Sequence, residues 1–148
     1  MSDHISVRDA GPDDTASLLQ LLAQIHADAE PPDPERSRRA LVRILGREDH
    51  ALLLAEDDGA PVGSVHVVVV LNLTHDGAPW AIIENLIVDE RSRRRGVGRA
   101  LIEEVVRRAR ARGCYKIQFL SAAHRFGAHA FYESLGFEAS ARGYRRYF

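Results

Sequence analysis

The sequence predicts a mixed α/β fold in which a central, mostly antiparallel sheet is flanked by helices on both faces. Runs of alternating or β-branched apolar residues, typical of strands, recur along the chain. Segments with apolar residues at helical spacing lie between them. The length of 148 residues suits one buried core, so we expect residues 1–148 to form a single domain.

The N-terminal part is expected to contain one strand followed by two helices. Residues 5–8 alternate and indicate the strand. A first helix is expected to start at Pro12, where Asp13 and Asp14 suit the first turn, and Pro31 and Pro32 end it. A second helix is expected over residues 34–45. The apolar stripe of the first helix consists of Leu18, Leu21, Leu22 and Ile25.

The rest of the chain is expected to alternate between strands and helices. An apolar run and a β-branched run separated by a turn at residues 57–60 indicate a hairpin. Gly113 marks the end of the longest helix that follows. The expected strands are 50–56, 62–71, 81–88, 115–120 and 137–144, and the expected helices are 97–112 and 126–135.

A glycine-rich segment, residues 93–98 (RRRGVG), lies between a predicted strand and a predicted helix. Such a turn offers backbone N–H groups and the positive end of a helix dipole to an anion. Gly96 and Gly98 permit positive φ and close approach, so a pyrophosphate is the simplest ligand. The segment lacks the Gly-Lys-Ser/Thr ending of a P-loop, and Leu101 stands where a dinucleotide fingerprint needs its third glycine. A solvated basic turn is the structural alternative.

This loop, continued by Ala-Leu-Ile, resembles the acetyl-CoA loop of the GNAT superfamily of N-acetyltransferases. Residues 128–137 (AHAFYESLGF) resemble a second motif of that superfamily, A-x-x-F-Y-E-x-x-G-F. The two motifs stand in the family's order, separated by about one helix and one strand. The resemblance runs from about residue 83 to the end, whereas residues 1–80 match only in pattern. It implies the acyl-CoA N-acyltransferase fold and acetyl-CoA as co-substrate.

The resemblance also implies which residues bind the cofactor. Leu86, Ile87 and Val88 match the strand whose backbone pairs with the pantetheine arm, although their side chains also suit a core. Arg125 stands where many relatives have Asn. This difference puts in doubt any cofactor contact carried over from that Asn, and it suggests that Arg125 meets a phosphate of CoA. The residues implied for the pyrophosphate loop are Arg93, Arg94, Arg95, Gly96, Val97, Gly98 and Arg99.

Acetyl transfer from a thioester to an amine needs a proton acceptor, a donor for the thioester oxygen and a proton for the leaving thiolate. Glu84, an acid inside an apolar strand, is the candidate general base, and burial would raise its pKa; a structural Glu at the strand edge is the alternative. Tyr132 is the candidate general acid by resemblance, with aromatic packing as the alternative. A backbone N–H near Leu86, released by a bulge, is the implied oxygen donor.

The remaining candidates carry weaker signals. Trp80 and His75 precede the Glu84 strand and could line an acceptor pocket. His66, His124 and His129 are expected to be structural or solvated. The last two are five residues apart, a spacing that suits no metal pair on a helix face.

Charge and composition limit the partners. Residues 1–58 carry a net charge of about −7 and residues 59–148 about +6, and a basic half fits a multiply phosphorylated cofactor. The basic run at 91–112 has no interleaved aromatics, so no nucleic-acid partner is expected. Cys114 is the single cysteine, which excludes an intrachain disulfide and a thiolate metal site, and no metal is expected.

No apolar run of 18 residues and no secretory signal are visible, so neither a membrane partner nor export is expected, and a cytoplasmic location fits.

The expected function is acetylation of a primary amine on a small molecule. A basic residue before an Ala-His-x-Phe-Tyr segment resembles the aminoalkylphosphonate and aminoglycoside branches of the superfamily. A protein or peptide acceptor and a non-catalytic acyl-CoA-binding module are the alternatives. Relatives are often dimers, so a homodimer is a possible assembly.

Overall fold

The computed structural model describes residues 4–121 and 126–148. The chain forms two compact units, Met1–Gln118 and Phe119–Phe148. The first unit carries the sheet and the glycine-rich loop, and the second carries the Phe-Tyr-Glu motif.

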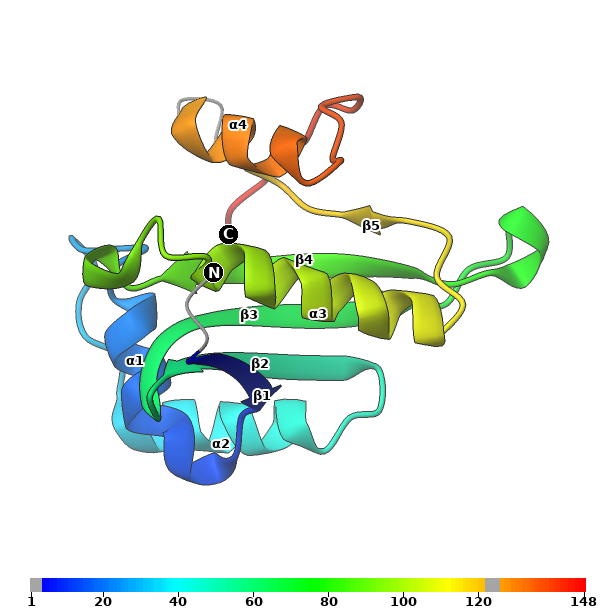
Figure 1. The fold of residues 1–148 in the computed structure, drawn as a ribbon. Helices are drawn as coiled ribbons and strands as arrows, with labels where there is room; N and C mark the ends of the chain where they lie inside the picture. The colour runs from blue at the N-terminus through cyan, green and yellow to red at the C-terminus, as the bar shows by residue number, and fades with distance from the viewer. Residues whose placement is uncertain (1–3, 122–125) are drawn as a thin grey trace. The chain divides into compact units, whose positions relative to one another are not determined.

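The first unit is built on a five-stranded sheet (Figure 1). The strands lie in chain order, and neighbours are antiparallel except for the parallel pair β4 and β5. This arrangement confirms the predicted mixed, mostly antiparallel sheet. The strands are β1 (Ile5–Asp9), β2 (His50–Asp57), β3 (Ala60–Val70), β4 (Trp80–Val88) and β5 (Ile117–Gln118), and the α-helices of this unit are α1 (Thr15–Leu22), α2 (Pro34–Leu45) and α3 (Val97–Ala111).

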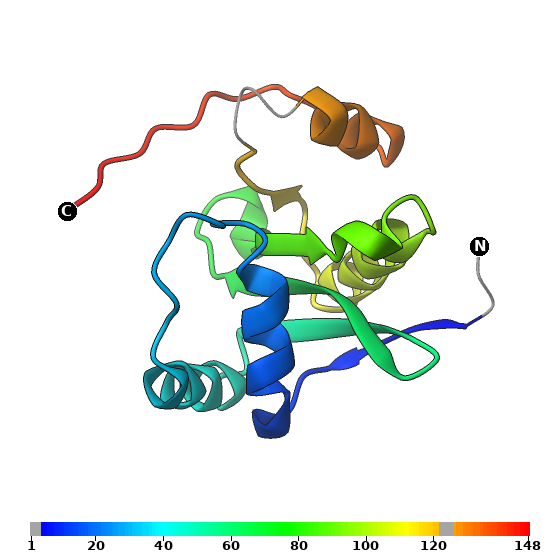
Figure 2. The ribbon, with the colours of Figure 1, turned by 90° about the vertical axis from the view of Figure 1, so that its left-hand side faces the viewer.

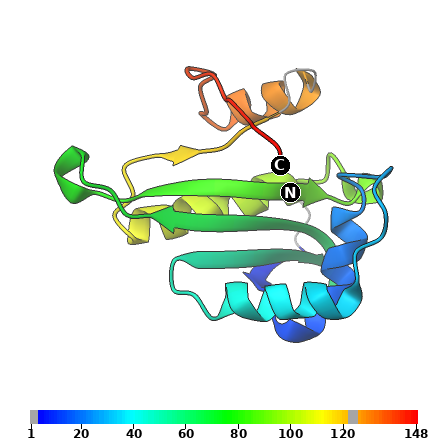
Figure 3. The ribbon, with the colours of Figure 1, turned by 180° about the vertical axis from the view of Figure 1, so that it is seen from behind.

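Helices cover both faces of the sheet. Helix α3 lies on one face (Figure 2), and α1 and α2 lie on the other, where they are seen from behind in Figure 3. The alternation of side chains along β2 explains this division, because Leu54 is buried in the cluster that contains Leu18 of α1 and Leu41 of α2. Its neighbour Leu53 is fully buried and points to the opposite face, toward α3.

Helix α3 approaches β3 closely at Gly63. A Cβ atom at that position would lie 2.9 Å from Val97 Cγ1 and 3.0 Å from the carbonyl oxygen of Ile87. Only glycine therefore lets the first turn of α3 rest on the sheet at this distance. The contact fixes the start of α3, and hence the glycine-rich loop, relative to β3 and β4.

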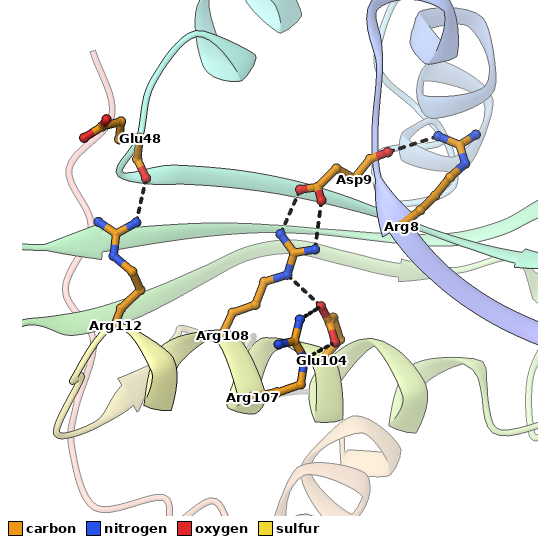
Figure 4. Close-up of polar contacts among 7 residues, drawn as sticks. All are labelled: Arg8, Asp9, Glu48, Glu104, Arg107, Arg108 and Arg112. Carbon is orange, nitrogen blue, oxygen red and sulfur yellow. Dashed lines mark hydrogen bonds and ion pairs between the residues drawn. The ribbon is translucent and has the colours of Figure 1, made fainter.

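Ion pairs hold the outer side of α3 to β1 (Figure 4). Arg108 donates from both terminal nitrogens to the Asp9 carboxylate, at 2.8 and 2.9 Å. Glu104 accepts from Arg108 Nε at 2.7 Å and from Arg107 at 2.6 and 2.8 Å. Arg112 donates to the carbonyl oxygen of Glu48 at 3.0 Å, just before β2.

The second unit contains α4 (Phe126–Ser134) and an extended tail. Gly136 adopts a φ of 87° after the helix, and the N–H of Phe137 donates to the Tyr132 carbonyl at 3.1 Å. Both features end the helix in the way a C-terminal glycine commonly does. The helix was predicted to within one residue.

Two sequence predictions about strands need correction. The strand expected over 137–144 is wrong, because these residues, all of which are described, are paired with no strand. Its apolar residues do not alternate consistently, and Tyr144 is 85% exposed, so no buried face favours a ladder. The strand expected over 115–120 shortens to Ile117–Gln118, since only two residues pair with β4.

No helix in the described part of the chain is both long and apolar enough to cross a membrane.

Candidate active site

The glycine-rich loop joins β4 to the N-terminus of α3, as its sequence predicts. Arg94 and Gly96 both have positive φ, 62° and 89°, and Gly96 precedes the first residue of the helix. The first hydrogen bond inside the helix runs from Ala100 N to Gly96 O at 3.0 Å. The preceding N–H groups, those of Val97, Gly98 and Arg99, have no partner within the helix. Three amides and the helix dipole therefore face one point, where an anion is favoured.

The loop begins at Asp89, which is buried and holds both sides of the turn in place. Its backbone N–H donates to the Val62 carbonyl at 2.8 Å, and its carboxylate accepts from the Arg91 N–H at 2.9 Å. The Gln24 amide bridges the Asp89 carboxylate at 3.4 Å and the Glu90 N–H at 3.1 Å. Hydrogen bonds from Arg91 lower the pKa of Asp89 to about 2, so the carboxylate stays charged.

The arginines of the loop differ in what they contact. Arg95 forms an ion pair with Asp57 at 2.7 Å, and the Asp57 side chain is only 12% exposed. This pair attaches the loop to the end of β2. Arg99 lies 3.9 Å from Glu103, one turn along α3. Arg93 and Arg94 are exposed.

A β-bulge interrupts β4 where the sequence analysis expected one. Ser64 pairs with Ile87 and His66 pairs with Glu84, so Val65 of β3 stands opposite two residues of β4, Asn85 and Leu86. Asn85 has a φ of 53°, which marks the irregular position. A bulge leaves one residue outside the regular ladder, and its N–H is then able to donate to a ligand. Strand β5, which runs parallel to β4, pairs only with Ala81 and Ile82, and both of these residues precede the bulge.

Glu84 lies on the face of the sheet opposite α3. Its partner His66 pairs in turn with Leu52, which packs in the α1–α2 cluster. Trp80 and Ile82 precede Glu84 at alternate positions and therefore share this face. The Glu84 side chain is exposed, so the expected burial of its carboxylate is wrong.

Sequence reasoning missed a histidine pair beside Glu84. His50 Nδ1 and His66 Nε2 are 2.9 Å apart, and the ring centroids are 5.1 Å apart. Burial, and then the neighbouring His50, lower the pKa of His66. The sequence alone predicts only a structural or solvated role for His66. The missing information was the register of β2 and β3, which decides whether the two rings share a face.

Tyr132 lies on α4 within an aromatic cluster of the second unit. Its ring packs edge-on against Phe119, with centroids 4.4 Å apart, and lies 6.4 Å from Phe137. Tyr132 thus packs against aromatic neighbours, but not against the expected last strand, because that strand does not form.

The other candidates of the sequence analysis divide into three groups. Trp80 shares the Glu84 face and has the Lys116 ammonium 4.8 Å from its ring centroid. His75 instead stacks on Tyr115, with centroids 3.9 Å apart. Arg125 and His124 lie outside the described residues. Among residues 4–121 and 126–148, no three His, Cys, Asp or Glu side chains gather as a metal ion would require.

Comparison with known proteins identifies the family. The acetyltransferase (GNAT) family model matches residues 16–137. A glucosamine 6-phosphate N-acetyltransferase from Trypanosoma brucei brucei is 36% identical over 87 residues, which cover 59% of this chain and 57% of that enzyme. An aminoglycoside N(6')-acetyltransferase type 1 from Stenotrophomonas maltophilia is 31% identical over 144 residues, covering 93% and 88%. A solved Trypanosoma brucei acetyltransferase has a TM-score of 0.82 at 27% identity, covering 97% and 99%.

The chain belongs to the acetyltransferase (GNAT) family. Acetyl-CoA-dependent N-acetyltransferases are thus the class of enzyme to which its fold and its glycine-rich loop correspond. The chain spans little more than half the length of the first of these relatives and most of the length of the second.

Proposed function

We propose that the protein transfers an acetyl group from acetyl-CoA to a primary amine of a small molecule by direct attack. The observation that carries this proposal is the loop at the start of α3, where three helix amides and two residues with positive φ form an anion site in a GNAT chain. The pyrophosphate of the cofactor binds the backbone N–H groups across residues 94–99. No metal takes part in the proposed reaction.

The side chains of the loop have separate roles in this proposal. Arg93 and Arg94 contact the phosphates of the cofactor, because both are exposed beside the amides. Arg95 contributes its backbone while its side chain holds the loop to Asp57. Arg125 contacts a further phosphate. The pantetheine arm pairs with the backbone of Leu86, Ile87 and Val88.

The bulge in β4 supports the placement of the thioester. Its carbonyl oxygen accepts a hydrogen bond from the N–H near Leu86, where the ladder with β3 is interrupted. Charge develops on this oxygen as the amine attacks, and a fixed backbone donor stabilises that charge without having to reorient. Such a donor typically contributes about 3–4 kcal/mol to transition-state stabilisation.

Glu84 and Tyr132 complete the reaction. The amine arrives protonated, Glu84 takes its proton directly or through water, and the neutral nitrogen attacks the thioester carbon. The new C–N bond forms while the C–S bond breaks. Tyr132 then protonates the leaving thiolate, since a phenol with a free pKa of about 10 still holds its proton at neutral pH.

Small amines fit the acceptor best among the classes considered. The two curated relatives are named for an amino sugar phosphate and for an aminoglycoside. Exposed Glu84 and the partly buried Ile82 and Trp80 give the acceptor face both an anionic and an apolar part. A protein or peptide acceptor is the second enzyme class and keeps the same chemistry.

The test is an acetylation assay with acetyl-CoA and a panel of amines, read by the mass of the product. The panel contains aminoglycosides, glucosamine 6-phosphate, simple alkylamines, and peptides with free N-termini or lysines. We expect an increase of about 42 Da on one class of small amine. Acetylation of peptides alone would replace the small-molecule assignment. Binding of CoA without acetylation of any amine would favour the non-catalytic module.

A further inference from the structure

The His50–His66 pair has a feature that ordinary packing does not require. An imidazole N···N hydrogen bond needs one N–H and one lone pair. At 2.9 Å, the nitrogens His50 Nδ1 and His66 Nε2 therefore share one proton between them. The pair is able to hand this proton from one ring to the other without any movement of the backbone.

The pair lies next to the proposed base. His66 is the strand partner of Glu84, and side chains directly opposite each other in a sheet have Cβ atoms about 4.5–5.5 Å apart. His50 lies diagonally from His66 on the same face, because His66 pairs with Leu52. The order across the sheet is Glu84 on β4, His66 on β3 and His50 on β2.

The far end of this row reaches water. The His50 side chain is 21% exposed, and its Nε2 lies 4.0 Å from Asp49 Oδ1. Asp49 itself accepts from Arg47 at 2.8 and 3.0 Å.

Few charged groups act on His66. Glu84 faces it from β4 and His50 from β2, with Asp49 beyond His50. Helix α1 contains no charged residue, α3 lies on the other face, and Arg43 in the last turn of α2 is exposed. Burial, and then the neighbouring His50, lower the pKa of His66, which favours the neutral form of its ring.

We propose that His66 and His50 form a proton relay that carries the acceptor amine's proton from Glu84 to water beside Asp49. This inference rests on the proposed acetyl transfer. Glu84 takes a proton from the ammonium and passes it to His66 Nδ1. His66 Nε2–H gives its proton to His50 Nδ1, and His50 Nε2–H releases one to water. One proton enters and one leaves, and exchange with water restores the starting tautomers.

The relay resolves a weakness of Glu84 as the sole base. An exposed carboxylate accepts a proton from an ammonium only transiently, because a carboxylic acid is much the stronger acid of the two. A free imidazole holds a proton better than a carboxylate does, and the lowered pKa of His66 narrows that difference. Transfer to His66 therefore makes the removal of the proton more favourable before the amine attacks. His66 and His50 are positioning residues here, because they act through Glu84.

The experiment uses His66→Gln and His50→Gln, with His26→Gln as the matched control on an exposed histidine. Turnover is measured at pH 7 in dilute buffer and again with added imidazole at constant ionic strength. We expect at least about a tenfold lower kcat for the first two variants in dilute buffer, recovered by imidazole. Wild type and the control variant should not respond to imidazole, and CoA affinity should be unchanged in all of them.

Two results would overturn the relay. The first is full turnover of both variants in dilute buffer. The second is a loss that imidazole does not recover, which would show a structural pair. Should the variants not fold, an NMR titration of the imidazole nitrogens in the wild type decides the matter: uptake of one shared proton supports the pair, and two independent protonations refute it. A wild type that acetylates no amine refutes the proposed function, and the relay with it.

Discussion

Glu84 lies beside an irregular position of β4, because the next residue, Asn85, has a φ of 53°. An acid inside an apolar run suggested a buried carboxylate, whereas the Glu84 side chain is exposed. Its strand partner His66 supplies the partly buried titratable group instead. The sequence places Glu84 in a strand, but what packs over that strand in the fold decides whether the side chain meets water.

We predict that Glu84→Gln lowers kcat/KM about 10²-fold at pH 7 and that high pH partly recovers the loss. An alkylamine has a pKa near 10.4, so a base is needed at neutral pH and becomes dispensable as free amine accumulates. Aryl amines, which are already neutral, should lose less. The measurement is a pH–rate profile of wild type and variant on one amine of each kind. Parallel profiles for both amines would show that Glu84 only binds the substrate or supports the strand.

We predict that Tyr132→Phe lowers kcat about 10²-fold while the affinity for CoA stays within a factor of two. The substitution removes the hydroxyl group and keeps the ring that packs against Phe119 and Phe137. Steady-state kinetics and calorimetric titration with CoA test this. Phe131→Leu, which changes the neighbouring ring of the same helix, serves as the control for packing. Unchanged kcat in Tyr132→Phe would leave Tyr132 as a packing residue alone.

At the scale of the element, two bulges decide which side chains of β2, β3 and β4 share a face. Between β2 and β3, Glu56 pairs with Pro61 but Ala55 pairs with Gly63, so Val62 is passed over. A continuous ladder would place His66 opposite Ala51 and would turn His50 to the other face. The strands themselves were predictable from alternation and turn residues. The register shifts at the two bulges were not predictable, because a bulge changes backbone pairing without a fixed signature in side-chain type.

The glycine-rich loop is held to the end of β2 by the ion pair between Arg95 and Asp57. We predict that Asp57→Asn weakens CoA binding about two- to fivefold, which is about 0.4–1 kcal/mol, by releasing Arg95 and loosening the turn. Asp58→Asn removes the same charge from the next position and should leave the affinity unchanged. Calorimetry on both variants makes the comparison. A tighter complex in Asp57→Asn would mean that Arg95, once released, prefers the phosphates.

Within helix α3, Glu104 accepts hydrogen bonds from Arg107 and from Arg108, the residue that also pairs with Asp9 of β1. The Arg107 hydrogen bonds lower the pKa of Glu104 from 4.5 to about 2. Its contribution to stability is thus complete above about pH 4.5 and is lost as the pH falls toward 2. We predict that Glu104→Gln costs about 1–2 kcal/mol at pH 7 and that the difference shrinks below pH 4. Urea unfolding at pH 7, 4 and 3 tests this, with Glu103→Gln as an exposed control.

For the whole molecule, the sequence was most informative in the first unit. Strands β1 to β4 and helices α2 and α3 lie within two residues of their predicted bounds, because each has a clear apolar pattern and a turn or cap at its ends. The tail after Phe137 shows the limit of such patterns. Apolar residues there suggested a strand, but a strand forms only when a partner and a buried face exist, and neither is coded locally.

Cofactor binding should stabilise the protein as a whole, because a ligand that binds only the folded state adds its binding free energy to folding. At a CoA concentration of 100 times Kd the gain is about 2.7 kcal/mol, which corresponds to a rise in Tm of roughly 5–10 °C for a chain of this size. We predict that Gly98→Asp abolishes most of this rise. An Asp in the first turn of α3 suits the helix dipole, so the variant should fold, yet its charge opposes the pyrophosphate. Gly98→Asn, equal in size and uncharged, separates the steric effect from the electrostatic one. A CoA-dependent rise as large in Gly98→Asp as in the wild type would place the cofactor away from this loop.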